Sequence, residues 1–177
     1  VHKLTSHHCQ INHITMNDKI NELLDQMNEI QNGKPWIGSS FAKKINLVEE
    51  MDFFRRPMKN MHSVAEIISH LTAWRLEVAL KIETGKGSLT DDDPSNWKNL
   101  KDLKLLGRSK ILQQYSESLS RVSELLADKD DAFLNRTYYD PDFKGEFTYS
   151  WLLHGMLQHD VYHLGQIGYI VKFLKIQ

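Results

Sequence analysis

Four long stretches of this chain repeat apolar residues at the spacing of an α-helix, and this pattern constrains the fold more than any other feature. It predicts helices over residues 17–31, 63–84, 109–127 and 149–172 or beyond. A helix with one apolar face must bury that face against a neighbour, and few segments carry the signals of a β-strand. We therefore expect an all-α fold, namely a four-helix bundle.

The second of these helices has the clearest boundaries. In the segment SVAE, Ser63 and Glu66 form a capping box, in which each side chain accepts a hydrogen bond from the other residue's backbone amide. The segment TGKG places glycine where a helix ends, so the helix should stop near Thr84.

The segments between the helices predict short elements and one long connection. A short helix over residues 41–51 should end at RRPMKN, and turn signals make residues 135–149 a loop or a short hairpin. Residues 87–103 form a connection long enough to cross the bundle. We therefore expect a long crossover connection, so a simple up-down-up-down order is not assured.

Composition and charge exclude several classes of partner. The 177 residues suffice for one domain with a core, and 22 basic against 23 acidic residues create no strong field to attract nucleic acid or an anionic membrane. One cysteine, Cys9, excludes an internal disulfide and a Cys-rich zinc site. The chain has no apolar run long enough to span a membrane and no charged-then-apolar leader. We expect a cytoplasmic protein.

The first 15 residues differ from the rest of the chain. They hold four of the nine histidines, lack a helical period and end just before Met16. We predict that residues 1–15 are a disordered leader or an upstream artefact, and that residues 16–177 form a single domain. The histidines of the leader are not expected to contribute to activity.

The segment HDVYHLGQ, residues 159–166, carries the strongest functional signal. At about 100° per residue, His159 and His163 lie roughly 40° apart on the last helix, in the same sector as its apolar residues, whereas His154 points elsewhere. Two buried imidazoles one turn apart need partners for their ring nitrogens, and one divalent metal ion can satisfy both. The alternative is a pair of core histidines that are hydrogen-bonded to tyrosine, aspartate or water.

His70 on the second helix is a third candidate ligand. It lies at the edge of the apolar face and near the middle of its helix, so two facing helices could supply His70, His159 and His163 to one ion. Three histidines leave an open coordination position, which is typical of catalytic metal sites. Asp160 stands where the zinc peptidase motif HExxH has glutamate, but it is one methylene shorter and no accompanying motif supports a peptidase.

Two segments of the chain resemble the helix signatures of one protein family. MHSVAEIISHLTAWR (61–75) and HDVYHLGQIGYIVK (159–172) resemble the second and last helices of the DinB-like (YfiT-like) metal-binding four-helix bundles. PWIGSSF and FTYSWLLHGMLQ are similar to one branch of that family, and the resemblance covers residues 16–177. It implies a bundle, often a homodimer, in which His70, His159 and His163 bind one divalent metal ion.

The resemblance also implies an activity. Members of the family with known chemistry are metal-dependent thiol transferases, which use bacillithiol or mycothiol, and a thiol-dependent isomerase. The chain is therefore expected to be a metal-dependent thiol S-transferase or a hydrolase of a small molecule, with zinc or nickel as the metal and a low-molecular-weight thiol as a candidate co-substrate. The alternatives are a non-catalytic metal-binding or interaction bundle, and a bundle whose histidines bind nothing.

Residues beside the candidate ligands have more than one interpretation. Gln166 could orient a ligand histidine or a bound water, or only bond a neighbouring carbonyl. Asp160 could support a ligand from behind or lie at the surface, and Tyr162 could form a hydrogen bond in the cavity. Gly165 is predicted to allow close packing. Core positions are predicted for two tryptophans, Trp74 and Trp151.

Overall fold

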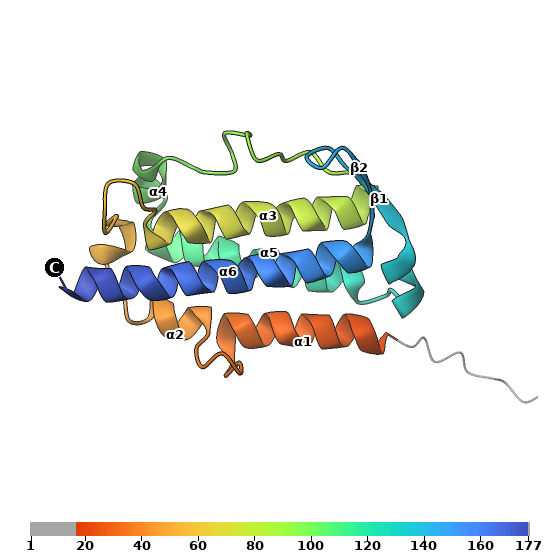
Figure 1. Cartoon of the computed structure of the whole chain (residues 1–177), viewed down its shortest axis with the longest axis horizontal. Helices are drawn as coiled ribbons and strands as arrows, with labels where there is room; N and C mark the ends of the chain where they lie inside the picture. The colour runs from red at the N-terminus through yellow and green to blue at the C-terminus, as the bar shows by residue number, and fades with distance from the viewer. Residues whose placement is uncertain (1–16, 177) are drawn as a thin grey trace, which may run out of the picture.

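The computed structural model describes residues 17–176, and of Ile176 only the backbone. Within this range, four long helices run side by side (Figure 1): α1 (Asp18–Asn32), α3 (Val64–Thr84), α5 (Arg108–Leu126) and α6 (Tyr149–Ile176). The predicted all-α four-helix bundle is confirmed, and each helix begins within about one residue of its predicted start. The predicted leader, residues 1–15, lies outside the described residues.

Shorter elements join the long helices: α2 (Phe41–Ile45), η1 (Asp52–Phe54), α4 (Leu100–Leu106), η2 (Asp131–Asn135), β1 (Thr137–Asp140) and β2 (Gly145–Thr148). The short helix predicted over residues 41–51 ends at Ile45, because the N–H groups of Leu47 and Val48 bond only three residues back and the chain turns. Residues 87–103, predicted as an irregular connection, contain the start of α4, where the Asn99 side chain accepts a hydrogen bond from the Asp102 amide.

The connection between α3 and α5 determines the topology. Gly85 ends α3 in the left-handed conformation, with φ of 73°, which glycine adopts without steric cost. The chain then runs back along the bundle to α4 (Figure 1), so α3 and α5 point the same way while α1 and α6 point the opposite way. The expected long crossover is confirmed. In the described part of the chain, no helix combines the length and the apolarity needed to cross a membrane.

The antiparallel hairpin β1–β2 closes one end of the bundle (Figure 1). The Gly87 amide donates to the Tyr139 carbonyl, and the Tyr139 amide donates to the Gly85 carbonyl, both at 3.0 Å. Of the two structures predicted for residues 135–149, a loop or a short hairpin, the hairpin is therefore the one formed. It is fastened to the start of the crossover.

Two apolar clusters fill the bundle. One lies toward α2, η1 and α4 and includes Phe53 and Leu71, and the other lies toward the hairpin and includes Leu119 and Met156. Between them, along each long helix, the sequence places a polar side chain in the core instead of an apolar one. The bundle is therefore divided into two apolar halves by a buried polar layer.

Arg75 is the centre of this polar layer and contacts all three other long helices. Its guanidinium is fully buried and donates to Asp160 Oδ2 on α6 (2.6 Å), to the Tyr115 hydroxyl on α5 (2.9 Å) and to Gln31 Oε1 on α1 (2.5 Å). The guanidinium also stacks over the Tyr115 ring at 4.1 Å. The sequence allowed Asp160 to lie at the surface, but in the structure its side chain is 0% exposed. The two opposite charges therefore compensate each other where water cannot.

Changing Asp160 to asparagine should lower the free energy of unfolding by about 3–5 kcal/mol, because it leaves the Arg75 guanidinium buried without its counter-charge. Chemical denaturation followed by circular dichroism measures the change. Asp128→Asn is the matched control, since Asp128 is exposed, and it should change stability by less than about 0.5 kcal/mol. A loss below about 1 kcal/mol for Asp160→Asn would contradict the central role of the pair.

The predicted capping box at the start of α3 is present. Ser63 Oγ accepts from the Glu66 amide at 3.3 Å, and Glu66 Oε2 accepts from the Ser63 amide at 2.8 Å. The Arg56 guanidinium also donates to both oxygens of the buried Glu66 carboxylate. Burial opposes ionisation of Glu66, but the hydrogen bonds from Arg56 and Ser63 outweigh it and lower the pKa of Glu66 to about 2.

The low pKa of Glu66 makes a pH-dependent contribution to stability. Because the folded-state pKa lies below the ordinary value of 4.5, the contribution is complete above that pH and is lost as the pH falls toward 2. Glu66→Gln should therefore destabilise the protein by about 1–3 kcal/mol at pH 7, and the difference from the wild type should shrink between pH 4.5 and pH 2. Urea denaturation across this range tests the expectation, and a difference independent of pH would contradict it.

Candidate metal centre

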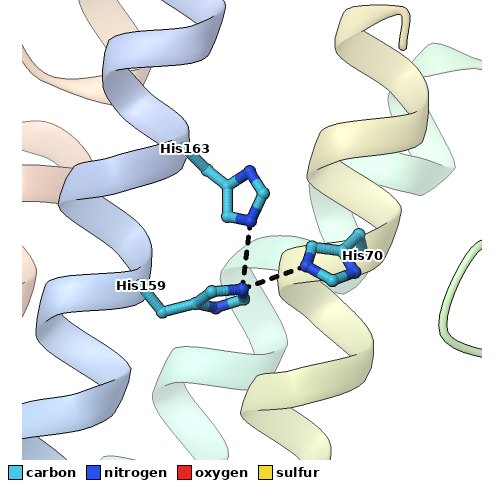
Figure 2. A group of neighbouring side chains, drawn as sticks. All are labelled: His70, His159 and His163. Atoms are coloured by element: carbon cyan, nitrogen blue, oxygen red, sulfur yellow. Dashed lines mark hydrogen bonds between the residues drawn. The ribbon is translucent and has the colours of Figure 1, made fainter. Parts of the chain in front are cut away.

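Three histidines from two helices meet between α3 and α6. His70 projects from α3, and His159 and His163 project from α6 (Figure 2). His159 Nε2 lies 3.0 Å from His70 Nε2 and 3.0 Å from His163 Nε2, and one ring nitrogen from each residue lies within 4.8 Å of the others. The structure thus brings together the three residues that the sequence selected.

The packing of the two helices explains this convergence. The Tyr149 hydroxyl, at the start of α6, donates to the Lys81 carbonyl near the end of α3 at 2.8 Å, so the helices lie antiparallel in a defined register. The i, i+4 spacing of His159 and His163 places both on the face of α6 that looks toward α3. His154 does not share this face; it is exposed and bonds the Ser150 carbonyl.

The crossover connection fixes the orientation of the His70 ring. His70 Nδ1 lies 2.7 Å from Asn96 Oδ1 and 3.3 Å from the Asn96 carbonyl, and both are acceptors. The Asn96 amide is itself oriented, because Trp74 Nε1 donates to its oxygen at 2.9 Å and its nitrogen donates to the Asp91 carbonyl at 3.0 Å. His70 Nδ1 therefore carries the proton, and His70 Nε2 is left with a free lone pair.

His163 has the same arrangement within α6. Its Nδ1 donates to Gln166 Oε1 at 2.7 Å, so His163 Nε2 also presents a lone pair. Gln166 thus bonds one of the three histidines on the side away from the cluster. This is one of the roles that the sequence allowed for it, namely to orient a ligand histidine. Such a contact fixes the tautomer and the ring direction of a histidine that binds a metal through its other nitrogen.

These tautomers make the cluster incomplete without a cation. The Nε2 atoms of His70 and His163 both direct lone pairs toward His159 Nε2, which as a neutral donor has only one hydrogen to offer. One of the two 3.0 Å contacts is then left without a hydrogen, whereas a metal ion accepts electron pairs from all three atoms. The two spacings of 3.0 Å are also close to the ~3.3 Å that separates nitrogens around a tetrahedral ion with bonds of about 2.0–2.1 Å.

The protonation state of the three rings suits metal binding. Burial lowers the pKa of His70, and burial together with the neighbouring imidazoles lowers the pKa of His159 to about 3 and of His163 to about 4. All three rings are therefore neutral near pH 7. A neutral imidazole is the form that binds a metal, so no proton needs to be removed.

A cavity of about 670 Å³ opens beside the three Nε2 atoms. It lies between α3 and α6, and the crossover connection and the hairpin tip also contribute to its wall. Trp74, predicted as a core residue, is only half-buried and lines this cavity, and Trp151 is 43% exposed at its hairpin end. Both tryptophans therefore face the cavity, and the prediction of core positions is wrong for them.

The remaining candidates do not touch the cluster as ligands would. The Asp160 carboxylate bonds Arg75, and it faces the core rather than the three histidines. It therefore cannot act as the glutamate of the zinc peptidase motif does. Tyr162 packs its ring edge against His163 with the centroids 5.0 Å apart, and its side chain is 63% exposed at the cavity wall.

Gly165 does not have the packing role that the sequence predicted. A Cβ atom built on it would meet nothing within 4 Å, and the residue is exposed. The prediction failed because a glycine between two motif residues does not indicate whether the space beside it is filled or empty.

Two site residues were missed by the sequence, Asn96 and Trp97. Asn96 orients His70, and the Trp97 ring stacks on the His70 ring at 3.9 Å and on the His62 ring at 3.9 Å. Both lie in the segment LTDDDPSNW of the crossover, where acidic residues and proline indicate only a solvated loop. Neither has a periodic signal that could connect it with His70, which for Asn96 is 26 positions earlier on a helix.

Comparisons with known proteins agree with this architecture. The family model of the DinB superfamily matches residues 41–167. YfiT from Bacillus subtilis, described as a probable metal-dependent hydrolase with an unusual four-helix bundle topology, has a TM-score of 0.71 and 16% sequence identity, over 98% of this chain and 94% of YfiT. A DinB-like protein from Bacillus subtilis, YjoA, has a TM-score of 0.61 and 13% identity, over 88% of this chain and 92% of that protein. No curated protein shows significant sequence similarity to this chain.

Changing Asn96 to leucine should weaken binding of Zn²⁺ about 10- to 100-fold, because His70 loses the acceptor that holds its proton on Nδ1. Competition with a chromophoric chelator measures the affinity, and ¹⁵N NMR of the imidazole nitrogens reports the tautomer of His70 directly. Asn28→Leu, on the exposed side of α1, is the control and should leave both unchanged. An unchanged affinity with an unchanged tautomer would show that Asn96 does not position the ring.

Proposed function

This chain belongs to the DinB superfamily, and we propose that it is a metal-dependent enzyme that hydrolyses a small molecule at a divalent ion held by His70, His159 and His163. The observation that carries the proposal is the set of three neutral Nε2 atoms that face one another at the wall of a cavity. The likeness to YfiT, a probable metal-dependent hydrolase, supports it.

The donor set favours a catalytic site over a structural one. Structural zinc sites use four protein ligands, whereas catalytic sites use three and keep one position for substrate or water. In the described part of the chain, residues 17–176, the cluster has three metal-binding side chains and a cavity large enough for a small molecule. Bound there, a divalent ion would supply Lewis acidity to a polar bond of the substrate.

The residues around the histidines have separate tasks in this proposal. Asn96 and Gln166 hold the Nδ1 protons of His70 and His163, which keeps both Nε2 lone pairs directed at one point. Trp97 covers one face of the His70 ring and restricts its movement. Substrate enters from the cavity side, where Tyr162 and Trp74 form part of the wall.

Metal content provides the direct test. Mass spectrometry of the purified protein should find one divalent ion per chain that is lost in the variants His70→Ala and His163→Ala, because two remaining nitrogens hold an ion poorly. His154→Ala is the matched control, since His154 lies on the same helix and is exposed, and it should keep the ion. Equal metal content in His163→Ala and His154→Ala would show that the three histidines do not bind the ion.

The bound ion should also stabilise the fold. A ligand that binds only the folded state stabilises it by RT ln(1 + [L]/Kd), about 2.7 kcal/mol at a hundredfold excess over Kd. A chelator should therefore lower the melting temperature of the wild type and of His154→Ala, but not that of His163→Ala. The metal-free protein should still fold, because the packing of the two apolar clusters does not depend on the ion. Unfolding of the chelated protein at room temperature would assign the ion a structural role instead.

Activity separates the possible reactions. A panel of small esters, lactones and amides should show turnover that depends on the metal and on His163, and a parallel panel of electrophiles with low-molecular-weight thiols tests thiol transfer. Turnover only with thiols would replace hydrolysis by S-transfer at the same site. Absence of both, in protein that carries the ion, would favour a non-catalytic metal-binding bundle.

A further inference from the structure

Gly155 occupies a position inside α6, about two turns from its start, where glycine has no packing reason. Glycine destabilises a helix interior relative to alanine. A Cβ atom at Gly87 would overlap the buried side chains of Glu77 and Lys81, so the packing there favours glycine. A Cβ atom at Gly155 would meet nothing within 4 Å, yet the residue lines the cavity beside the histidines. The missing side chain therefore leaves room in the cavity and not in the protein core.

The cavity has the shape of a slot that follows both helices. On α3 it is lined by His70, Trp74, Val78 and Lys81, which lie on one face and span about 16 Å at the helical rise of about 1.5 Å per residue. On α6 it is lined by residues from Trp151 to Gln166. The three histidines lie toward one end of this slot, and Gly155 lies between them and the hairpin end.

Aromatic rings form much of the wall. Trp97 stacks on His70, and Trp74 lies edge-on to His159 with the ring centroids 6.2 Å apart. At the hairpin end, Phe143 and Trp151 pack edge to face at 5.2 Å. Aromatic side chains in a cavity wall favour an apolar aromatic ligand, because the ligand leaves water and contacts their rings.

The end of the slot away from the histidines contains charges that are already compensated. Lys81 Nζ donates to Asp140 Oδ2 at 2.8 Å and lies 3.6 Å from Glu77 Oε1. The Asp140 carboxylate accepts two further hydrogen bonds, from the amides of Asp142 and Phe143. Lys81 is thus paired within the wall, and the Asp142 carboxylate, which also lines the cavity, accepts a hydrogen bond from the Asp91 amide, so among the lining residues this end offers no free lysine or arginine to an anionic ligand.

We propose that the slot binds the uncharged aromatic, or similarly flat apolar, body of a small substrate, and that Gly155 makes the room for it. The proposal rests on the proposed function in one respect, that the histidine end would act on a polar group attached to this body. Binding of the body itself depends only on the slot.

The test uses 2-acetylnaphthalene, an uncharged aromatic ketone without a chelating group, and isothermal titration calorimetry on metal-loaded and chelator-treated protein. Gly155→Phe fills the slot and should weaken binding by about tenfold or more, and Gly155→Leu should act in the same direction. Gly165→Phe is the matched control: a Cβ atom there also meets nothing within 4 Å, but Gly165 does not line the cavity. It should bind the ketone as the wild type does.

The outcomes distinguish this inference from the proposed function. Circular dichroism should show melting temperatures of the Gly155 variants that are unchanged or higher, since a larger residue replaces glycine in a helix. Wild-type protein that fails to bind the ketone, or equal binding by Gly155→Phe and Gly165→Phe, would overturn the inference even if the metal is present. Tighter binding of the 2-naphthyltrimethylammonium cation than of the ketone would contradict the proposal that the bound aromatic body is uncharged. Ketone binding by the chelator-treated protein is expected, whereas ketone binding by a protein that takes up no divalent ion when ions are supplied would refute only the proposed function.

Discussion

The buried ion pair between Arg75 and Asp160 is the interaction on which the rest of the bundle depends. Taking a guanidinium and a carboxylate out of water is costly, and each charge and each hydrogen bond that the pair keeps offsets part of this cost. Here Gln31 on α1 and Tyr115 on α5 accept hydrogen bonds from the guanidinium, while Arg75 Nε and Asp160 Oδ1 have no hydrogen-bond partner among the described residues. Sliding any helix by one turn would leave a charge or a donor buried without its partner. The pair therefore specifies one register among the many that apolar stripes alone would allow.

This register is also what forms the metal centre. Arg75 lies five residues after His70 on α3, and Asp160 lies directly after His159 on α6, so the helix contact that joins the charges places the three imidazoles opposite one another. Helix α6 uses two faces at once, because a residue and its successor lie about 100° apart. His159 points to the cavity and Asp160 points to the core. The acid beside the histidine motif thus has a structural role rather than the catalytic one of a peptidase glutamate.

The sequence predicted the helices, the capping box at Ser63 and the three clustered histidines because these depend on local spacing, which a periodic pattern records. It did not predict Asn96 or Trp97, since both reach His70 from the crossover, whose path is set by tertiary contacts such as that between Asp91 and Asp142. It also misjudged Gly165, because no local pattern tells whether the space beside a glycine is filled. Partners that are distant in sequence and empty volume both require the packed structure.

The ion pair and the histidines are further connected by charge. Burial is the main cause that keeps His159 neutral, the other two imidazoles add to it, and the positive charge of Arg75 lowers its pKa further. Asp160 neutralises Arg75 from the core side, so the guanidinium is held beside the histidines without raising the net charge of the bundle interior. A cluster of protonated imidazoles would repel a divalent ion, whereas neutral ones present three lone pairs to it. The same core residues that specify the helix register therefore also keep the three nitrogens in the form that can bind a metal.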